Sequence, residues 1–306
     1  MSSVHLKISS ALISLAAIVF TLQSSVVSQA TSDLLSNVVA QYNNLSLASP
    51  YPDGFGIQLK ASAILNVAYP SGVIQLGHPY SASDVASLPK IALQTGSDST
   101  TFKAPNAFTL MLADANALGN PDKQGNYRHY LENGATFGDP DSNGTMTLNS
   151  GSGTVVTSYA GPGPLPNEGP HRYAWMLFVQ PSAFQAPSNL SSAGVGPGHW
   201  YVNDYVSSTH LGDLVAASFF TVENGHASFT PKPTAVPSSN NSNGTKTSVP
   251  VTGAPKASAQ SADAGRLAQM NFASLVKSIV TGLGTIIRIL DVSVYQSSQQ
   301  LILTME

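Results

Sequence analysis

The chain has 306 residues, with 13 lysine and arginine, 16 aspartate and glutamate, no cysteine and a formal net charge of −3. So few basic residues argue against nucleic-acid binding, which depends on clustered lysine and arginine. The lack of cysteine excludes disulfide scaffolds, thiolate catalysis and iron–sulfur clusters. A charged fraction of only 9% implies a surface hydrated mainly by serine, threonine, asparagine and glycans.

The N-terminal residues 1–30 have the pattern of a secretory signal peptide. A positive start that ends at Lys7 precedes an apolar run from Ile8 to Phe20, and Ser-Gln-Ala at 28–30 is a small-x-small cleavage site. We therefore expect a mature chain that begins near Thr31 and is secreted, either extracellular or held at the cell surface. The alternative is an N-terminal membrane anchor, but the apolar run is shorter than the roughly 20 residues that span a bilayer.

Glycosylation is expected on the secreted chain. Five N-x-S/T sequons are candidate acceptors, at Asn44, Asn143, Asn189, Asn240 and Asn243.

The first expected element of the mature chain is a helix over residues 31–44, because apolar residues from Leu34 to Tyr42 recur at helical spacing. From 45 to 230 the pattern is mainly β, with short apolar runs separated by Gly, Pro, Asn and Asp clusters. The expected strands are Ala63–Tyr69, Val73–Leu76, Lys90–Leu93, Phe108–Leu112, Gly153–Tyr159, Arg172–Val179 and Leu214–Val222. Short helices are expected near Ala82–Leu88 and Tyr201–Leu211.

The C-terminal part of the chain is expected to lie outside this domain. Residues 231–265 are rich in Ser, Thr and Pro and have too few large apolar side chains to order, which indicates a disordered linker or stalk. Residues 266–306 are an apolar tail that partly fits a GPI attachment signal, although Lys277 and Arg288 interrupt it. An amphipathic helix is the alternative for this tail.

Several catalytic patterns are missing from the sequence. It has no G-x-S-x-G elbow, no H-E-x-x-H, no Walker A loop and no G-x-G-x-x-G after a strand. We therefore expect no catalytic residues and no cofactor. A metal site built from Asp114, His129 and His171 is the less favoured reading of those residues, and no metal is expected.

A Gly/Pro loop that runs into His171-Arg172-Tyr173 is the most informative motif. Such a loop lets the backbone approach a small ligand closely, and imidazole and phenol are hydrogen-bond donors. Side chains alternate along a strand, so His171 and Tyr173 should share one face, while Arg172 leaves from the other and pairs with a structural acid. Trp175 is expected on the same face as Tyr173, in the core.

This segment resembles the phosphatidylethanolamine-binding protein family, whose signature is a Gly/Pro-rich loop followed by Gly-x-His-Arg-Tyr. Segments 108–117 and 127–130 look like the family's Asp-Pro-Asp-Ala-Pro strand end and its next, His-containing strand. Segment 211–220 is similar to the family's last core strand. The resemblance covers about residues 55–225 and implies a β-sandwich-like domain with a few short peripheral helices.

Carried over by position, the family's anion pocket falls on Asp114, His129, His171 and Tyr173, with Gly163 and Pro164 at its rim. The chain departs from the family pattern at Asn116 and Leu118, which stand in place of an Asp and a Pro. These departures predict a less constrained loop after Asp114 and the loss of one partner for Arg172.

The resemblance implies a non-enzymatic protein that binds a small anion, such as a phosphate or a phospholipid head group. Because imidazolium favours anions, binding is expected to strengthen as pH falls from about 8 towards 6. Two alternatives remain open at this point. One is inhibition of a serine carboxypeptidase, through the N-terminal helix, and the other is a cell-surface scaffold on a glycosylated stalk.

Overall fold

The computed structural model describes residues 31–95, 100–103 and 106–230. The expected signal peptide (1–30), linker (231–265) and C-terminal tail (266–306), with the sequons at Asn240 and Asn243, lie outside the described residues. Of the other sequons, Asn143 and Asn189 are exposed and Asn44 is half-buried.

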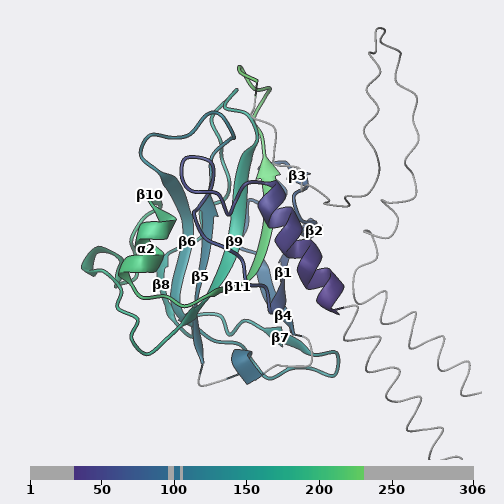
Figure 1. Ribbon diagram of the computed structural model, residues 1–306, viewed down its shortest axis with the longest axis vertical. Coiled ribbons are helices and arrows are strands. Elements are labelled where there is room, and N and C mark those ends of the chain that lie inside the picture. The colour runs from purple at the N-terminus through teal and green to yellow at the C-terminus, as the bar shows by residue number, and fades with distance from the viewer. Residues whose placement is uncertain (1–30, 96–99, 104–105, 231–306) are drawn as a thin grey trace, which may run out of the picture. The chain divides into compact units, whose positions relative to one another are not determined.

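The described part of the chain is mainly β, as the sequence predicts, and its strands form two sheets (Figure 1). The small sheet has the order β2 (Gly72–Val73), β1 (Ala63–Tyr69), β4 (Lys90–Thr95) and β7 (Thr145–Thr147). The large sheet has the order β10 (Gly198–Trp200), β6 (Asn126–Ala135), β5 (Ala107–Asp114), β9 (His171–Gln180), β11 (Leu214–Val222) and β3 (Pro79–Tyr80), and β8 (Thr154–Thr157) pairs with β6. All pairs are antiparallel except β11 with β3.

The large sheet is buried on both faces, which explains the continuous apolar runs in its central strands. On β9, Tyr173, Trp175 and Leu177 pack towards the small sheet, in one core cluster with Leu65 and Leu93. The alternate residues of β9 belong to a second cluster on the opposite face: Ala174, Met176 and Phe178. The fold therefore has two hydrophobic layers, one on each side of the large sheet.

Helices cover the second face of the large sheet. Residues 31–44 are helical, and Val38 and Tyr42 bury their side chains in the cluster that contains Met176. The short α2 (Val202–Ser208) adds Val202 and Tyr205 to the same cluster. Figure 1 shows both helices against the strands of the large sheet. Two 3-10 turns complete the helical content of the described residues, η1 (Thr100–Phe102) and η2 (Ser188–Leu190).

Two local expectations were wrong. Residues 82–85 form turns and 86–88 are irregular, instead of a helix, because the Asp84 carboxylate accepts hydrogen bonds from the backbone and side chain of Ser81 and closes the segment on itself. The strand expected at 73–76 is only the two-residue β2, since the chain bonds to β1 once more, through the Ile74 N–H and the Val67 carbonyl oxygen at 2.9 Å, and then turns at 76–77. Among the described residues, no helix combines the length and apolar character that crossing a membrane requires.

Candidate functional site

The residues expected to bind an anion come from three adjacent strands at one end of the large sheet. Asp114 is the last residue of β5, and it pairs directly with Tyr173 on the antiparallel β9. His171 begins β9, and His129 lies on β6, the other neighbour of β5. The strand order therefore brings together residues that lie up to 59 positions apart in the chain, from 114 to 173.

A β-bulge places His129 in this site. Leu112 pairs with Tyr130 and Ala113 with Arg128, so His129 is an extra residue without a partner on β5. A bulge of this kind redirects a side chain relative to regular alternation. The His129 ring lies with its centroid 5.3 Å from the ring centroid of Tyr173.

The Asp114 carboxylate joins the His171 ring to the loop that follows β5. Its Oδ2 lies 2.7 Å from His171 Nδ1, and its Oδ1 accepts the backbone N–H of Asn116 at 2.6 Å. Asn116 has a φ of 61°, in the left-handed region, and its side-chain amide donates to the carbonyl oxygen of Gly125 at 3.0 Å. Leu118 is buried. Asn116 therefore supplies two hydrogen bonds to the loop that was expected to be less constrained than in the family.

Tyr173 lies beside both imidazoles. Its ring centroid is 6.4 Å from that of His171 and 5.5 Å from that of Phe220, on which it stacks. Burial, and then the neighbouring charge of Asp114, raise the pKa of the Tyr173 phenol far above its ordinary value. The hydroxyl therefore stays protonated and can donate a hydrogen bond.

The two histidines differ in their protonation. Burial lowers the pKa of His129, whose Nδ1 lies 2.8 Å from the carbonyl oxygen of Ala160. Burial also opposes charge on His171, but the hydrogen bond and charge of Asp114, with a smaller contribution from Glu168, outweigh it and raise its pKa. Of the two rings, His171 therefore carries positive charge more readily near neutral pH.

Arg172 leaves β9 on the opposite face, and its hydrogen bonds go to backbone carbonyls instead of the structural acid expected from the sequence. The guanidinium donates to the carbonyl oxygens of Leu45, Asp53, Ala115 and Asn116 at 2.8, 2.7, 2.6 and 2.9 Å. Burial lowers its pKa to about 10, against the charges of Asp114 and Asp53. The side chain at position 116 is not a partner of Arg172, and the backbone carbonyl of Asn116 accepts from the guanidinium instead.

The remaining predicted residues are placed as follows. Gly163 is exposed, while Pro164 is buried and its carbonyl oxygen accepts the side-chain amide of Asn224 at 3.2 Å. Trp175 is fully buried between the sheets, where its indole N–H donates to the Tyr69 hydroxyl at 3.1 Å.

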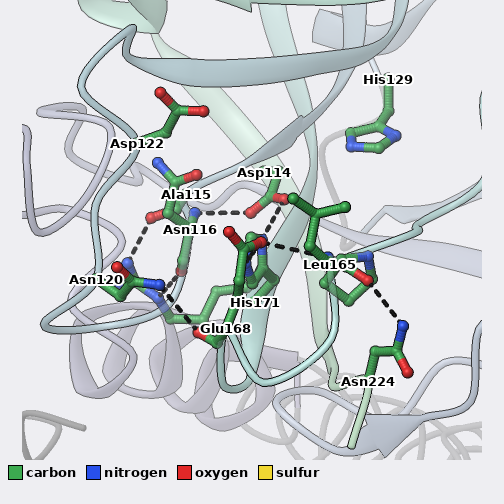
Figure 2. Close-up of polar contacts among 12 residues, drawn as sticks. Asp114, Ala115, Asn116, Asn120, Asp122, His129, Leu165, Glu168, His171 and Asn224 are labelled. Carbon is green, nitrogen blue, oxygen red and sulfur yellow. Dashed lines mark hydrogen bonds and ion pairs between the residues drawn. The ribbon is translucent and has the colours of Figure 1, made fainter. Parts of the chain in front are cut away.

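Sequence reasoning missed Glu168. One of its carboxylate oxygens lies 3.4 Å from Nε2 of His171, as Figure 2 shows beside the Asp114 contact. The only signal in the sequence is an acidic residue three positions before His171, in a loop whose path the sequence does not reveal.

Comparisons with known proteins agree with this fold. A family model for phosphatidylethanolamine-binding protein matches residues 67–220, about half of the chain. An uncharacterized protein of Saccharomyces cerevisiae is 31% identical over 172 residues, which cover 54% of this chain and 84% of that protein.

Solved structures with the same fold include a carboxypeptidase Y inhibitor in complex with its cognate proteinase. It is 21% identical, with a TM-score of 0.50 over 63% of this chain and 97% of the inhibitor. A phosphatidylethanolamine-binding protein from Plasmodium vivax matches with 11% identity and a TM-score of 0.42, over 61% of this chain and 97% of that one. The family model and the yeast relative together show that this chain belongs to the phosphatidylethanolamine-binding protein family.

Proposed function

We propose that this protein binds a small anionic ligand, a phosphate ester or a phospholipid head group, without catalysing a reaction. The observation that carries the proposal is the state of His171. Its Nδ1 is held by Asp114, while its Nε2 is buried without a hydrogen-bond partner. A buried nitrogen of this kind is costly unless it is satisfied, and an oxyanion at hydrogen-bond distance would satisfy it.

The neighbouring groups suit the same role. With Asp114 fixing the proton on Nδ1, a protonated His171 donates from Nε2 to the anion. Tyr173 adds a neutral hydroxyl donor beside Asp114. His129 is neutral and uses its Nδ1–H on the Ala160 carbonyl, so its Nε2 is an acceptor that suits a protonated ligand group, such as the ammonium of phosphorylethanolamine. The raised pKa of Tyr173 makes its phenol a poor nucleophile, which favours binding over covalent catalysis.

The test is calorimetric titration of phosphorylethanolamine into wild type, His171→Ala and the control His210→Asn. His210 is exposed and follows α2, beyond the other end of β9. Loss of a charge-assisted hydrogen bond should weaken binding about 10- to 150-fold in His171→Ala, and His210→Asn should match wild type. No saturable binding by wild type at millimolar ligand, or equal affinity in His171→Ala, would contradict the proposal.

The shared fold with a carboxypeptidase Y inhibitor favours a second candidate, inhibition of a serine carboxypeptidase. The helix of residues 31–44 was the expected contact, but its side chains Val38 and Tyr42 pack on the large sheet. Only its polar side is open to a protease. Inhibition assays with wild type and His171→Ala separate the two candidates: an inhibitor that acts away from the anion site retains its potency in the variant. If neither binding nor inhibition is found, the scaffold alternative replaces both.

A further inference from the structure

The loop before β9 fixes the backbone on both sides of Glu168. Asn167 and Gly169 have φ angles of 66° and 81°, so the chain turns sharply around Glu168. The Asn167 N–H donates to the carbonyl oxygen of Asn224 at 2.9 Å, and its carbonyl oxygen accepts the N–H of Ser228 at 3.1 Å. The loop is therefore tied to the segment after β11.

The Glu168 side chain lies against the nitrogen that the proposed ligand would contact. Its Oε2 is 3.4 Å from His171 Nε2, but the geometry gives no hydrogen bond, and Nε2 has no other partner. The same oxygen accepts the backbone N–H of Leu165 at 3.2 Å. Figure 2 shows the carboxylate beside the imidazole ring. A carboxylate oxygen therefore occupies the neighbourhood where an anion would sit.

The positive charge of a protonated His171 is more than compensated without a ligand. Asp114 lies at Nδ1 and Glu168 at Nε2, so two carboxylates flank one imidazole. Arg172 lies next to His171 in the chain but on the opposite face of β9, and the pKa of His129, beyond Tyr173, is lowered by burial. An incoming anion therefore meets a carboxylate of the same sign before it reaches His171.

We propose that Glu168 is an internal counter-anion of the site, whose carboxylate must be displaced from His171 before an anionic ligand can bind. This inference rests on the proposed anion-binding function. The Glu168 side chain is 35% exposed, whereas that of His171 is 10% exposed, so rotation about the Glu168 side-chain bonds can carry the carboxylate into solvent. Such a rotation breaks one hydrogen bond, to Leu165, and leaves the anchored backbone in place.

The test compares Glu168→Gln and Glu168→Ala with wild type and with the charge-matched control Asp139→Asn. Asp139 is exposed and lies past the far end of β6 from His129. Ethyl phosphate is the calorimetric probe, because it offers the anion without an ammonium group. Both Glu168 variants should bind it about tenfold more tightly than wild type, since a like charge a few ångströms from the ligand is removed. The control should not change.

A second measurement is the NMR titration of His171, which needs no ligand. Its pKa should fall in both Glu168 variants and stay constant in Asp139→Asn. An unchanged pKa would overturn the inference whatever the binding data, and so would a lower pKa with unchanged or weaker ethyl phosphate affinity. If wild type and both variants all fail to bind ethyl phosphate, the proposed function fails and displacement of Glu168 fails with it. Binding by the Glu168 variants alone supports both.

Discussion

Arg172 should be the most sensitive polar position in the fold. Its side chain is buried and donates to four backbone carbonyl oxygens, two in the segment before β1 and two in the loop after β5. Arg172→Ala removes all four donors at once. The strands would keep the hydrogen bonds of their own pairing, but the two segments would lose a group that joins them, in addition to the Tyr51 hydroxyl bonded to the Asp122 carbonyl.

The size of the stability loss follows from the four carbonyl oxygens that Arg172→Ala leaves without a donor. A buried acceptor without a partner costs about 1–3 kcal/mol, and four of them set an upper range that water entering the vacated space would reduce. Removing one partner of a buried charged network costs about 3–5 kcal/mol. We therefore expect Arg172→Ala to lower the free energy of unfolding by about 3–5 kcal/mol.

Urea denaturation at pH 7 measures this change, with Arg128→Ala as the matched control. Arg128 is a buried arginine of the same sheet, but it donates to one carbonyl, of Gly196, and to the hydroxyl of Thr157. Arg128→Ala should lower the free energy of unfolding by less, on the order of 1–3 kcal/mol. The reasoning is refuted if Arg172→Ala costs under about 1 kcal/mol, or no more than Arg128→Ala.

Three further predictions concern the core, the site and processing. Trp175→Ala should cost about 3–5 kcal/mol in the same urea assay, because the ring is fully buried and bonded to Tyr69, and a loss under about 1 kcal/mol would contradict this packing. Phosphorylethanolamine affinity should rise as pH falls from about 8 towards 6, because the raised pKa of His171 lets imidazolium form at a higher pH than in a free histidine, and calorimetry that finds a flat profile would assign binding to other groups. Mass spectrometry of the secreted protein should find a mature start near Thr31 and a mass that falls after glycosidase treatment, whereas an intact, unglycosylated N-terminus would end the secretory hypothesis.

Most of the long strands could be predicted from their apolar residues, because they are buried. The exception is β6 (Asn126–Ala135), whose polar residues interrupt the run, so that only the family resemblance at 127–130 indicated it. Continuous apolar runs mark β5 and β9, and β1 and β11 were predicted with the bounds that the structure gives them. The bounds of the short strands could not be predicted. Two or three residues make up each of β2, β3, β7 and β10, and each exists only through pairing with a longer neighbour. No periodicity can be recognised over that length.

The candidate site also has a part that the sequence predicts and a part that only the structure reveals. His171 and Tyr173 share a face because they alternate on one regular strand, which the sequence reveals. His129 reaches Tyr173 through a bulge, and only the register between β5 and β6 shows it. Glu168 reaches His171 through two left-handed residues of a loop. Alternation along a strand therefore cannot place these two side chains: the family resemblance indicated His129, and neither the residue pattern nor the resemblance indicated Glu168.

The carbonyls held by Arg172 also limit how a partner can use the N-terminal segment. Leu45 and Asp53 lie between the helix of residues 31–44 and β1, and both depend on a guanidinium from the strand that begins with His171. Peeling this segment away would leave a buried cation with half of its acceptors. We therefore expect a protease or other partner that contacts the N-terminal helix to recognise it docked, as a preformed surface, because extracting it as an extended peptide would take the Leu45 and Asp53 carbonyls from Arg172, the residue next to His171 of the proposed anion site.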